Sequence, residues 1–307
     1  MALERFEFAP GTAIVTGAAS GMGEQLAYSL ADRGSSLALV DRDAVRLDKV
    51  AATVRARTTK PVATYVVDLA DDEATRNLGG RLAAGHPDTR LLINNAGVAL
   101  AGSFDQVSAE EFDWLLAVNL RAVVTLTRAL LPTLRARPGA HLVNVSSVFG
   151  LIAPAGQVAY STSKYAVRGF TEALRAELYG HVGVTVVHPG GVRTRIAENA
   201  RISAALTARA AKADAEPDAG PDAGPDAKSG TTRDSERGAK GDSSSVAHLL
   251  NYPADRAAER ILDAVSRRRP RLLIGSSARL PDLLTRASPS LTPVLLDVFR
   301  KRTARGN

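Results

Sequence analysis

The sequence predicts an α/β fold: a single doubly wound parallel sheet of about seven strands with helices on both faces. Short apolar runs that suit buried strands alternate with segments of helical periodicity from residue 12 onward. The runs are continuously apolar, as expected when helices cover both sides of a sheet. The first run, residues 12–15, leads through a glycine-rich turn directly into a helix. These three observations favour βαβ units with right-handed crossovers, the Rossmann-type arrangement.

The elements can be placed along the chain by their residues. The predicted strands are 12–15, 37–40, 61–67, 90–93, 140–145, 184–187 and 272–274. The predicted helices are 24–31, 44–57, a polar helix from 71, a long and interruptible helix from 109 to about 134, 160–178, and segments around 282–286 and 294–302. Ser108 is expected to cap the long helix, because Glu110 and Glu111 stand in its first turn.

The glycine-rich turn, residues 16–23, has the composition of a phosphate-binding loop. A strand that turns through glycines into a helix presents free backbone N–H groups and a positive dipole end to an anion. A side chain in the turn would hold phosphates away from that backbone. Asp41 closes the second predicted strand, where an acid can bind a ribose hydroxyl. The pattern indicates a dinucleotide site.

Composition narrows the class of protein. The chain has 307 residues, 45% of them hydrophobic, and no cysteine. The absence of cysteine excludes disulfides, thiolate metal sites and a cysteine nucleophile. The five histidines show no metal-ligand spacing, so no metal is expected. Neither a signal core nor a membrane-spanning run is evident, which favours a cytoplasmic protein.

The formal net charge of +7 is concentrated near the C-terminus, at residues 267–271 and 300–302. Basic blocks can contact nucleic acid or anionic lipid. No aromatic residues are interleaved with them for base stacking, so a nucleic-acid partner is not expected. The segment 277–307 mixes leucines with basic residues and is predicted to be helical. It is expected to pack on the sheet edge or on a second subunit, with peripheral membrane contact as the alternative.

One segment, about 211–245, interrupts the alternation. It lacks apolar residues and repeats Pro-Asp-Ala-Gly from Pro217 and Pro221. Such a segment cannot bury enough surface to offset its ordering entropy, so it is predicted to be disordered. The elements after it are too few to form a second domain. We therefore interpret residues 1–307 as one domain with an insertion in the region of a substrate lid.

Four polar residues have positions that suit proton transfer. Tyr160 and Lys164 are four apart on a predicted helix and share a face. Ser147 follows a strand, so it is expected at the same sheet edge as the glycine turn. A phenol is a poor base near neutrality, and a neighbouring ammonium would favour the phenolate. Asn119 is an amide on an apolar helix stripe and, taken alone, reads as a hydrogen-bonded packing residue.

Taken together, these motifs resemble the short-chain dehydrogenase/reductase family, in its common TGxxxGxG and YxxxK form. The resemblance covers residue 11 to about 200. It rests on Thr16-Gly17 with Gly21-Met22-Gly23, Asp68, Asn94-Asn95-Ala96-Gly97, Asn119, Ser147, Tyr160 with Lys164, and Pro189-Gly190-Gly191-Val192-Arg193-Thr194. It implies that Tyr160 is the acid/base, Lys164 holds the nicotinamide ribose, Ser147 orients the substrate oxygen and Asn119 supports a water in the proton relay.

The resemblance also implies the residues that contact the cofactor. Besides Tyr160 and Lys164, they are Gly17, Ser20, Gly21, Met22, Gly23, Asp41, Arg42, Asp68, Leu69, Asn95, Ala96, Gly97, Pro189, Gly190, Val192 and Thr194. Asp41 would repel a 2′-phosphate, so NAD is favoured. Arg42 could hold that phosphate, so NADP is the alternative. Ser147, Phe149, Gln157 and Tyr160 are expected to contact substrate.

The predicted function is the interconversion of a secondary alcohol and a ketone with an apolar body, of steroid, terpenoid or acyl type. Phe149, Gln157, Ile196 and Ile202 would give a mainly apolar pocket. Two alternatives stay open: a 3-oxoacyl-type reductase that uses NADPH, and a dinucleotide-binding sensor without turnover. Family members usually assemble through their two long helices, so a homodimer or homotetramer is expected.

Overall fold

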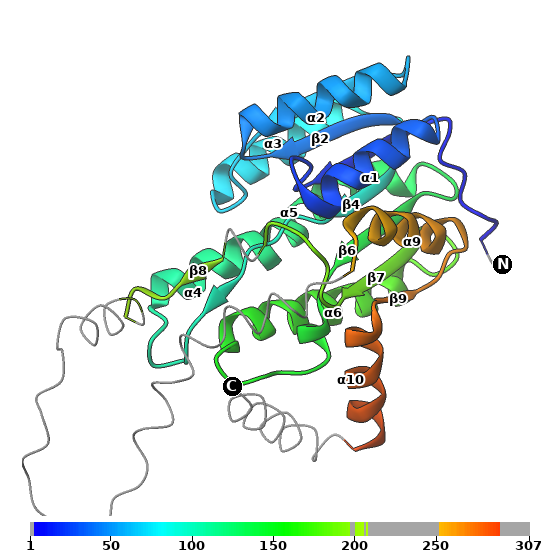
Figure 1. Ribbon diagram of the computed structural model, residues 1–307. Helices are drawn as coiled ribbons and strands as arrows, with labels where there is room; N and C mark the ends of the chain where they lie inside the picture. Colours follow the sequence, from blue (N-terminus) through cyan, green and yellow to red (C-terminus); the bar gives the residue numbers. More distant parts are fainter. Residues whose placement is uncertain (1–2, 197–199, 206, 208–251, 289–307) are drawn as a thin grey trace, which may run out of the picture.

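A seven-stranded sheet, parallel throughout, forms the centre of the molecule (Figure 1). The computed structural model describes residues 3–196, 200–205, 207 and 252–288. The strand order is β3-β2-β1-β4-β6-β7-β9. The strands are β1 Thr12–Thr16, β2 Ser36–Asp41, β3 Val62–Val66, β4 Thr89–Asn94, β6 His141–Val145, β7 Gly183–Pro189 and β9 Arg271–Ile274. The predicted doubly wound fold is confirmed, and its strand order reverses between β1 and β4.

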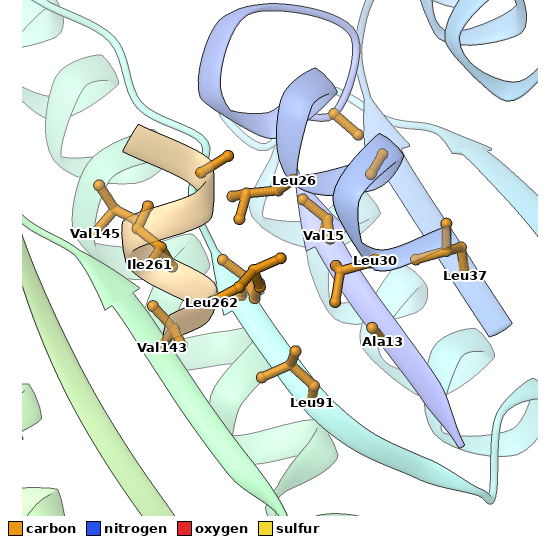
Figure 2. Packing of buried hydrophobic residues seen from close by; sticks show 14 of the residues in the cluster. Ala13, Val15, Leu26, Leu30, Leu37, Leu91, Val143, Val145, Ile261 and Leu262 are labelled. Atoms are coloured by element: carbon orange, nitrogen blue, oxygen red, sulfur yellow. The ribbon is translucent and has the colours of Figure 1, made fainter. Parts of the chain in front are cut away.

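Helices cover both faces of this sheet. They are α1 Gly21–Asp32, α2 Ala44–Arg57, α3 Asp72–Gly85, α5 Ala122–Arg135, α6 Val158–Glu177 and α9 Ala254–Ser266. Two further helices, α4 Ala109–Leu116 and α10 Ser276–Ala287, contribute no residue to the two clusters packed on these faces. Successive strand residues point to opposite faces. Thus Ala13 and Val15 pack with α1, α2 and α9, whereas Ile14 packs with α3, α5 and α6. Figure 2 shows the first of these clusters, with Leu26 and Leu30 facing Ile261 and Leu262.

The predicted long helix is continuous but changes pitch. Ser108 caps α4 in a reciprocal capping box with Glu111. A π-helical turn, η1 (Ala117–Arg121), then joins α4 to α5 and carries Asn119. Single π-helical turns are frequent at functional sites, because the extra residue re-aims a side chain. The helix Ala109–Arg135 is long and apolar enough to cross a membrane, but half of its most apolar window is buried inside the protein.

The structure contains two features that the sequence analysis did not predict. Helix α9 lies against α1 and buries Ala257, Ala258, Ile261, Leu262, Ala264 and Val265. Its apolar residues recur at helical spacing, so the pattern was readable from the sequence. The second feature is a short parallel pair, β5 (Leu100–Ala101) with β8 (Arg201–Ile202). Two-residue strands carry no periodicity, and only tertiary pairing defines them.

The predicted insertion at about 211–245 and the segment 294–302 lie outside the described residues. Of the predicted helical segment 277–307, residues 277–287 are part of α10 and 289–307 are not described. The interpretation of the chain as one domain stays a prediction.

The burial of α9 gives a stability prediction. Leu262 is fully buried, so Leu262→Ala should lower the free energy of unfolding by about 2–5 kcal/mol through lost burial and a residual cavity. Leu280 in α10 is 62% exposed, and Leu280→Ala should change it by less than about 0.5 kcal/mol. Urea unfolding of both variants measures the difference. Equal, small losses would mean that α9 does not belong to the core.

Candidate active site

The glycine turn after β1 makes a close approach that only glycine permits. Gly17 has φ 66°, and a Cβ there would lie 2.9 Å from the Ala96 Cα. A Cβ on Gly23 would overlap the Gly17 carbonyl oxygen. Ser20 stands at the N-cap of α1, but its side chain makes no capping hydrogen bond. The first-turn N–H groups of α1 therefore lack a side-chain acceptor, which suits an anion.

Hydrogen bonds tie β1 to β4 where the strand order reverses. The Thr16 hydroxyl accepts from the backbone N–H groups of Asn95 and Ala96, each at 3.0 Å. The Asn95 side chain in turn donates to the Thr16 carbonyl at 2.9 Å. In an open parallel sheet, ligands bind at this switch point, outside the carboxyl ends of the strands.

Asp41, at the end of β2, is held in place by backbone donors. Its carboxylate accepts from the N–H groups of Ala19 at 2.9 Å and Asp43 at 3.1 Å. Arg42 beside it is exposed. Each carboxylate oxygen retains a second lone pair, so Asp41 can still accept hydrogen bonds from a ribose. The glycine turn and this carboxylate together fit the adenosine half of a dinucleotide.

Tyr160 and Lys164 lie on one face of α6 and are buried. The Lys164 Nζ lies 5.6 Å from the centre of the Tyr160 ring and donates to the Val145 carbonyl at 3.3 Å. Burial lowers the pKa of Lys164 to about 8, because the ammonium is desolvated. A Cβ on Gly97 would come within 3.2 Å of this Nζ. Glycine at position 97 thus keeps space open beside the ammonium.

The pKa of Tyr160 corrects a sequence-based expectation. Burial raises the pKa of the Tyr160 phenol, and a hydrogen bond with the Ser147 side chain opposes this rise. The expected acidic phenol is therefore not found: the pKa of Tyr160 lies above its ordinary value, because burial penalises the phenolate more than the hydrogen bond favours it. That Lys164 lowers this pKa stays a prediction.

Asn119 is fully engaged in protein hydrogen bonds. Its Oδ1 accepts from the Val98 N–H at 2.8 Å, and its Nδ2 donates to the Val98 carbonyl at 2.9 Å and the Ser163 hydroxyl at 3.1 Å. The residue therefore fixes the chain after β4 against α6, as a buried packing amide would. The water-supporting role that the resemblance implies stays a prediction.

The turn after β7 is held by the C-terminal helix. Gly191 N–H donates to the Ser277 hydroxyl at 3.0 Å, and a Cβ on Gly190 would overlap that hydroxyl oxygen. A Cβ on Gly21 would come within 3.1 Å of Thr194, so the glycine turn and the turn after β7 face each other. Residues of both turns line one cavity.

One cavity brings most of the predicted site residues together. Those that line it are Gly17, Ser20, Met22, Asp41, Arg42, Asp68, Leu69, Asn95, Ala96, Gly97, Ser147, Tyr160, Lys164, Pro189, Gly190, Val192, Thr194 and Ile196. Gly21, Gly23 and Asn119 are not among the residues that line it. Six further lining residues were not predicted: Val67, Val98, Val118, Val145, Ser146 and Arg195. Val118 lies in η1 and the other five lie at strand ends or in loops; none belongs to a motif of its own, so no sequence signal marks them.

Two predicted substrate residues do not line the cavity. Phe149 packs edge to face against the Tyr160 ring at 5.9 Å between centroids, and so supports the phenol from outside. Gln157 is at the N-cap of α6 and forms a bridge with Gly102. Ile202, proposed as a lid residue, is 59% exposed in β8. Among the described residues, no group of three His, Asp or Glu side chains could hold a metal.

Comparison with known proteins assigns the chain to a family. The family model described as short chain dehydrogenase matches residues 11–204, which is more than half of the chain. The chain belongs to the short-chain dehydrogenase family. The resemblance seen in the motifs is therefore confirmed, and the protein is an oxidoreductase of this family.

Individual relatives agree with this assignment. A Mycobacterium tuberculosis protein that bears the name oxidoreductase SadH is 40% identical over 194 residues, 62% of this chain and 70% of its own. A short-chain dehydrogenase/reductase of Burkholderia phymatum, solved in complex with NAD, superposes with a TM-score of 0.74 at 27% identity and covers 93% of this chain and 96% of its own. A Sphingobium yanoikuyae short-chain dehydrogenase, solved with NADPH, gives 0.68 at 28% identity and covers 92% and 94%.

The buried ammonium gives this family member a testable pH dependence. The pKa of Lys164 is lower in the folded chain, about 8, than in the unfolded chain, so the unfolded chain binds more protons between the two values. The free energy of unfolding should therefore rise by about 2 kcal/mol from pH 7.5 to 9.5.

Lys164→Met should abolish that rise, whereas Lys60→Met, at an exposed position, should preserve it. Urea unfolding at the two pH values measures the difference. A rise of the same size in Lys164→Met would assign it to another group.

Proposed function

We propose that this protein is an NAD(P)-dependent oxidoreductase that interconverts a secondary alcohol and a ketone. The observation that carries the proposal is the joint placement of Tyr160, Ser147 and Lys164 in the cavity that also holds the glycine turn and Asp41. A buried phenol beside a site that fits a dinucleotide has a clear use in hydride transfer coupled to proton transfer. A sensor without turnover would have no use for it.

Cofactor binding is proposed from the residues that would hold it. The first-turn N–H groups of α1 would bind the pyrophosphate, and Asp41 the adenosine ribose. Lys164 would donate to the nicotinamide ribose, since its Nζ lies in the cavity beside Gly97. When bound, the nicotinamide supplies or accepts the hydride.

Proton transfer falls to Tyr160. Because burial raises its pKa, the phenol is the favoured form, and a phenol gives its proton to a carbonyl oxygen during reduction. Oxidation of an alcohol requires the phenolate, which accepts the proton that the hydroxyl loses. The Ser147 hydroxyl would stabilise negative charge that develops on the substrate oxygen.

The choice between NAD and NADP is proposed from charge. The Asp41 carboxylate would repel a 2′-phosphate, which favours NAD. The exposed Arg42 beside it is the one feature of this corner that would accept such a phosphate. Solved relatives of similar identity include one complex with NAD and one with NADPH, so both cofactors occur among similar proteins.

A substrate with an apolar body is proposed from the lining. Val98, Val118, Val145 and Ile196 line the cavity together with Tyr160. Apolar walls around a few polar groups bind an apolar ligand and orient its one polar atom. A steroid, terpenoid or acyl-type ketone has this chemistry. Homo-oligomer assembly, cytoplasmic location and membrane contact of the C-terminal segment stay predictions.

Removal of the phenol hydroxyl tests the proposed chemistry. Tyr160→Phe should lower kcat by at least about 100-fold, the scale of general acid–base catalysis, while the Kd for NAD stays within about 3-fold. Tyr165→Phe, on the same helix but 39% exposed, is the matched control and should retain activity. A screen of apolar secondary alcohols with NAD and NADP supplies the substrate. Unchanged turnover in Tyr160→Phe would remove the proton-transfer role.

Replacement of the acid tests the cofactor choice. Asp41→Ala should raise kcat/KM with NADP relative to NAD by about 10-fold or more, because a repulsive charge is lost beside Arg42. Asp48→Ala, at an exposed site on α2, should leave the ratio unchanged. Loss of NAD binding without a gain for NADP would mean that Arg42 is not a latent phosphate site.

A further inference from the structure

We propose that His188 is a positioning residue that holds the Ser147 hydroxyl toward Tyr160 by donating a hydrogen bond from Nδ1 to the Ser147 main-chain carbonyl. His188 lies in β7 and is fully buried, and Ser147 comes two residues after the end of the neighbouring strand β6. The distance from Nδ1 to the Ser147 carbonyl oxygen is 3.0 Å. The inference rests on the proposed function, because it assigns a residue to the same reaction.

The hydrogen bond fixes the state of the imidazole. A carbonyl oxygen only accepts, so Nδ1 carries a proton. Burial lowers the pKa of His188 to about 4, so the ring is neutral near pH 7 and Nε2 carries no proton. That Nε2 is buried and has no hydrogen-bond partner among the described residues.

An aliphatic side chain at this position would fill the same space without a buried polar group. What the histidine adds to packing is the Nδ1 donor. That donor holds the main-chain carbonyl of Ser147, whose side chain hydrogen-bonds with Tyr160.

Ser147 needs such support because it leaves the sheet at this point. It is the N-cap of a short 3-10 turn, Val148–Gly150, and its hydroxyl also accepts from the Phe149 N–H at 3.1 Å. A hydroxyl on a three-residue turn is only as well placed as the backbone beneath it. The Gly150 N–H donates to the Ser147 carbonyl at 3.0 Å within the turn, and His188 ties the same carbonyl to the neighbouring strand.

The charged groups around His188 come from three elements. Arg168 and Glu172 of α6 pair at 3.0 Å, and Arg271 of β9 pairs with Asp282 of α10. Each pair is internally neutral. The neutral imidazole is therefore the stable neighbour, and the anchor is expected to persist across the working pH range.

Two substitutions separate the hydrogen bond from packing. His188→Leu removes the donor and should lower kcat about 100-fold, the effect of a small misplacement at a reacting centre, with the Kd for NAD within about 3-fold. His188→Asn keeps a donor near the Nδ1 position and should restore kcat to within about 5-fold of the native value. His141→Leu, at a fully buried histidine on the far end of β6, is the control for destabilisation and should leave kcat within about 3-fold.

A second readout does not require turnover. The Ser147 hydrogen bond lowers the pKa of Tyr160, so loss of the anchor should raise it further. Carbon-13 NMR of labelled tyrosine, with Tyr160→Phe to assign the signal, measures this pKa in each variant. We expect a higher pKa of Tyr160 in His188→Leu, and the native pKa in His188→Asn and His141→Leu.

The outcomes separate the two proposals. If no substrate is turned over but the pKa of Tyr160 rises in His188→Leu alone, the positioning role stands and the proposed function fails. If turnover is found but His188→Leu keeps both the native kcat and the native pKa of Tyr160, His188 is a packing residue. If His188→Asn restores neither kcat nor the native pKa of Tyr160, the hydrogen-bond donor does not position Ser147, and the proposal is wrong.

Discussion

The hydrogen bonds between Thr16 and Asn95 fix the carboxyl ends of β1 and β4 against each other, and the geometry of the site depends on this contact. The strand order of the sheet reverses between these two strands. The clamp brings the chain after β4 so close to the first turn that Gly17 can carry no side chain. The cavity, the free N–H groups of α1 and the placement of Lys164 beside Gly97 all follow from this fixed edge.

Desolvation governs the chemistry of the groups at that edge. Burial lowers the pKa of Lys164 and raises the pKa of Tyr160, so each shift favours the neutral form. The protein therefore holds an acid and a base in a cavity that stabilises neither charge strongly. Such a site responds readily to a bound ligand, because each new hydrogen bond or charge counts more where water is excluded. The Ser147 hydroxyl is the group of the chain that already favours the phenolate.

The C-terminal elements α9, β9 and α10 pack on the same sheet and site, although the family match ends at residue 204. Helix α9 completes one layer over the sheet, and β9 supplies its last strand. The first turn of α10 holds the turn after β7 through Ser277. A change in α10 can thus reach the turn after β7, whose residues Pro189 and Gly190 line the cavity. Residues on both sides of the predicted insertion therefore shape this cavity.

The sequence by itself determined the seven strands of the sheet, the helices between them apart from α9, the glycine turn, Asp41 and the helix that carries Tyr160 and Lys164. These features are local: each is marked by a hydrophobic period, a helix cap or a backbone conformation that only glycine permits. Tertiary structure alone decided which side chains reach the cavity: Phe149 packs on the Tyr160 ring without lining it, and Gln157 does not line it either. It also decided the direction of the pKa of Tyr160 and the bond from His188 to Ser147, because burial and contacts between separate strands depend on how distant segments pack.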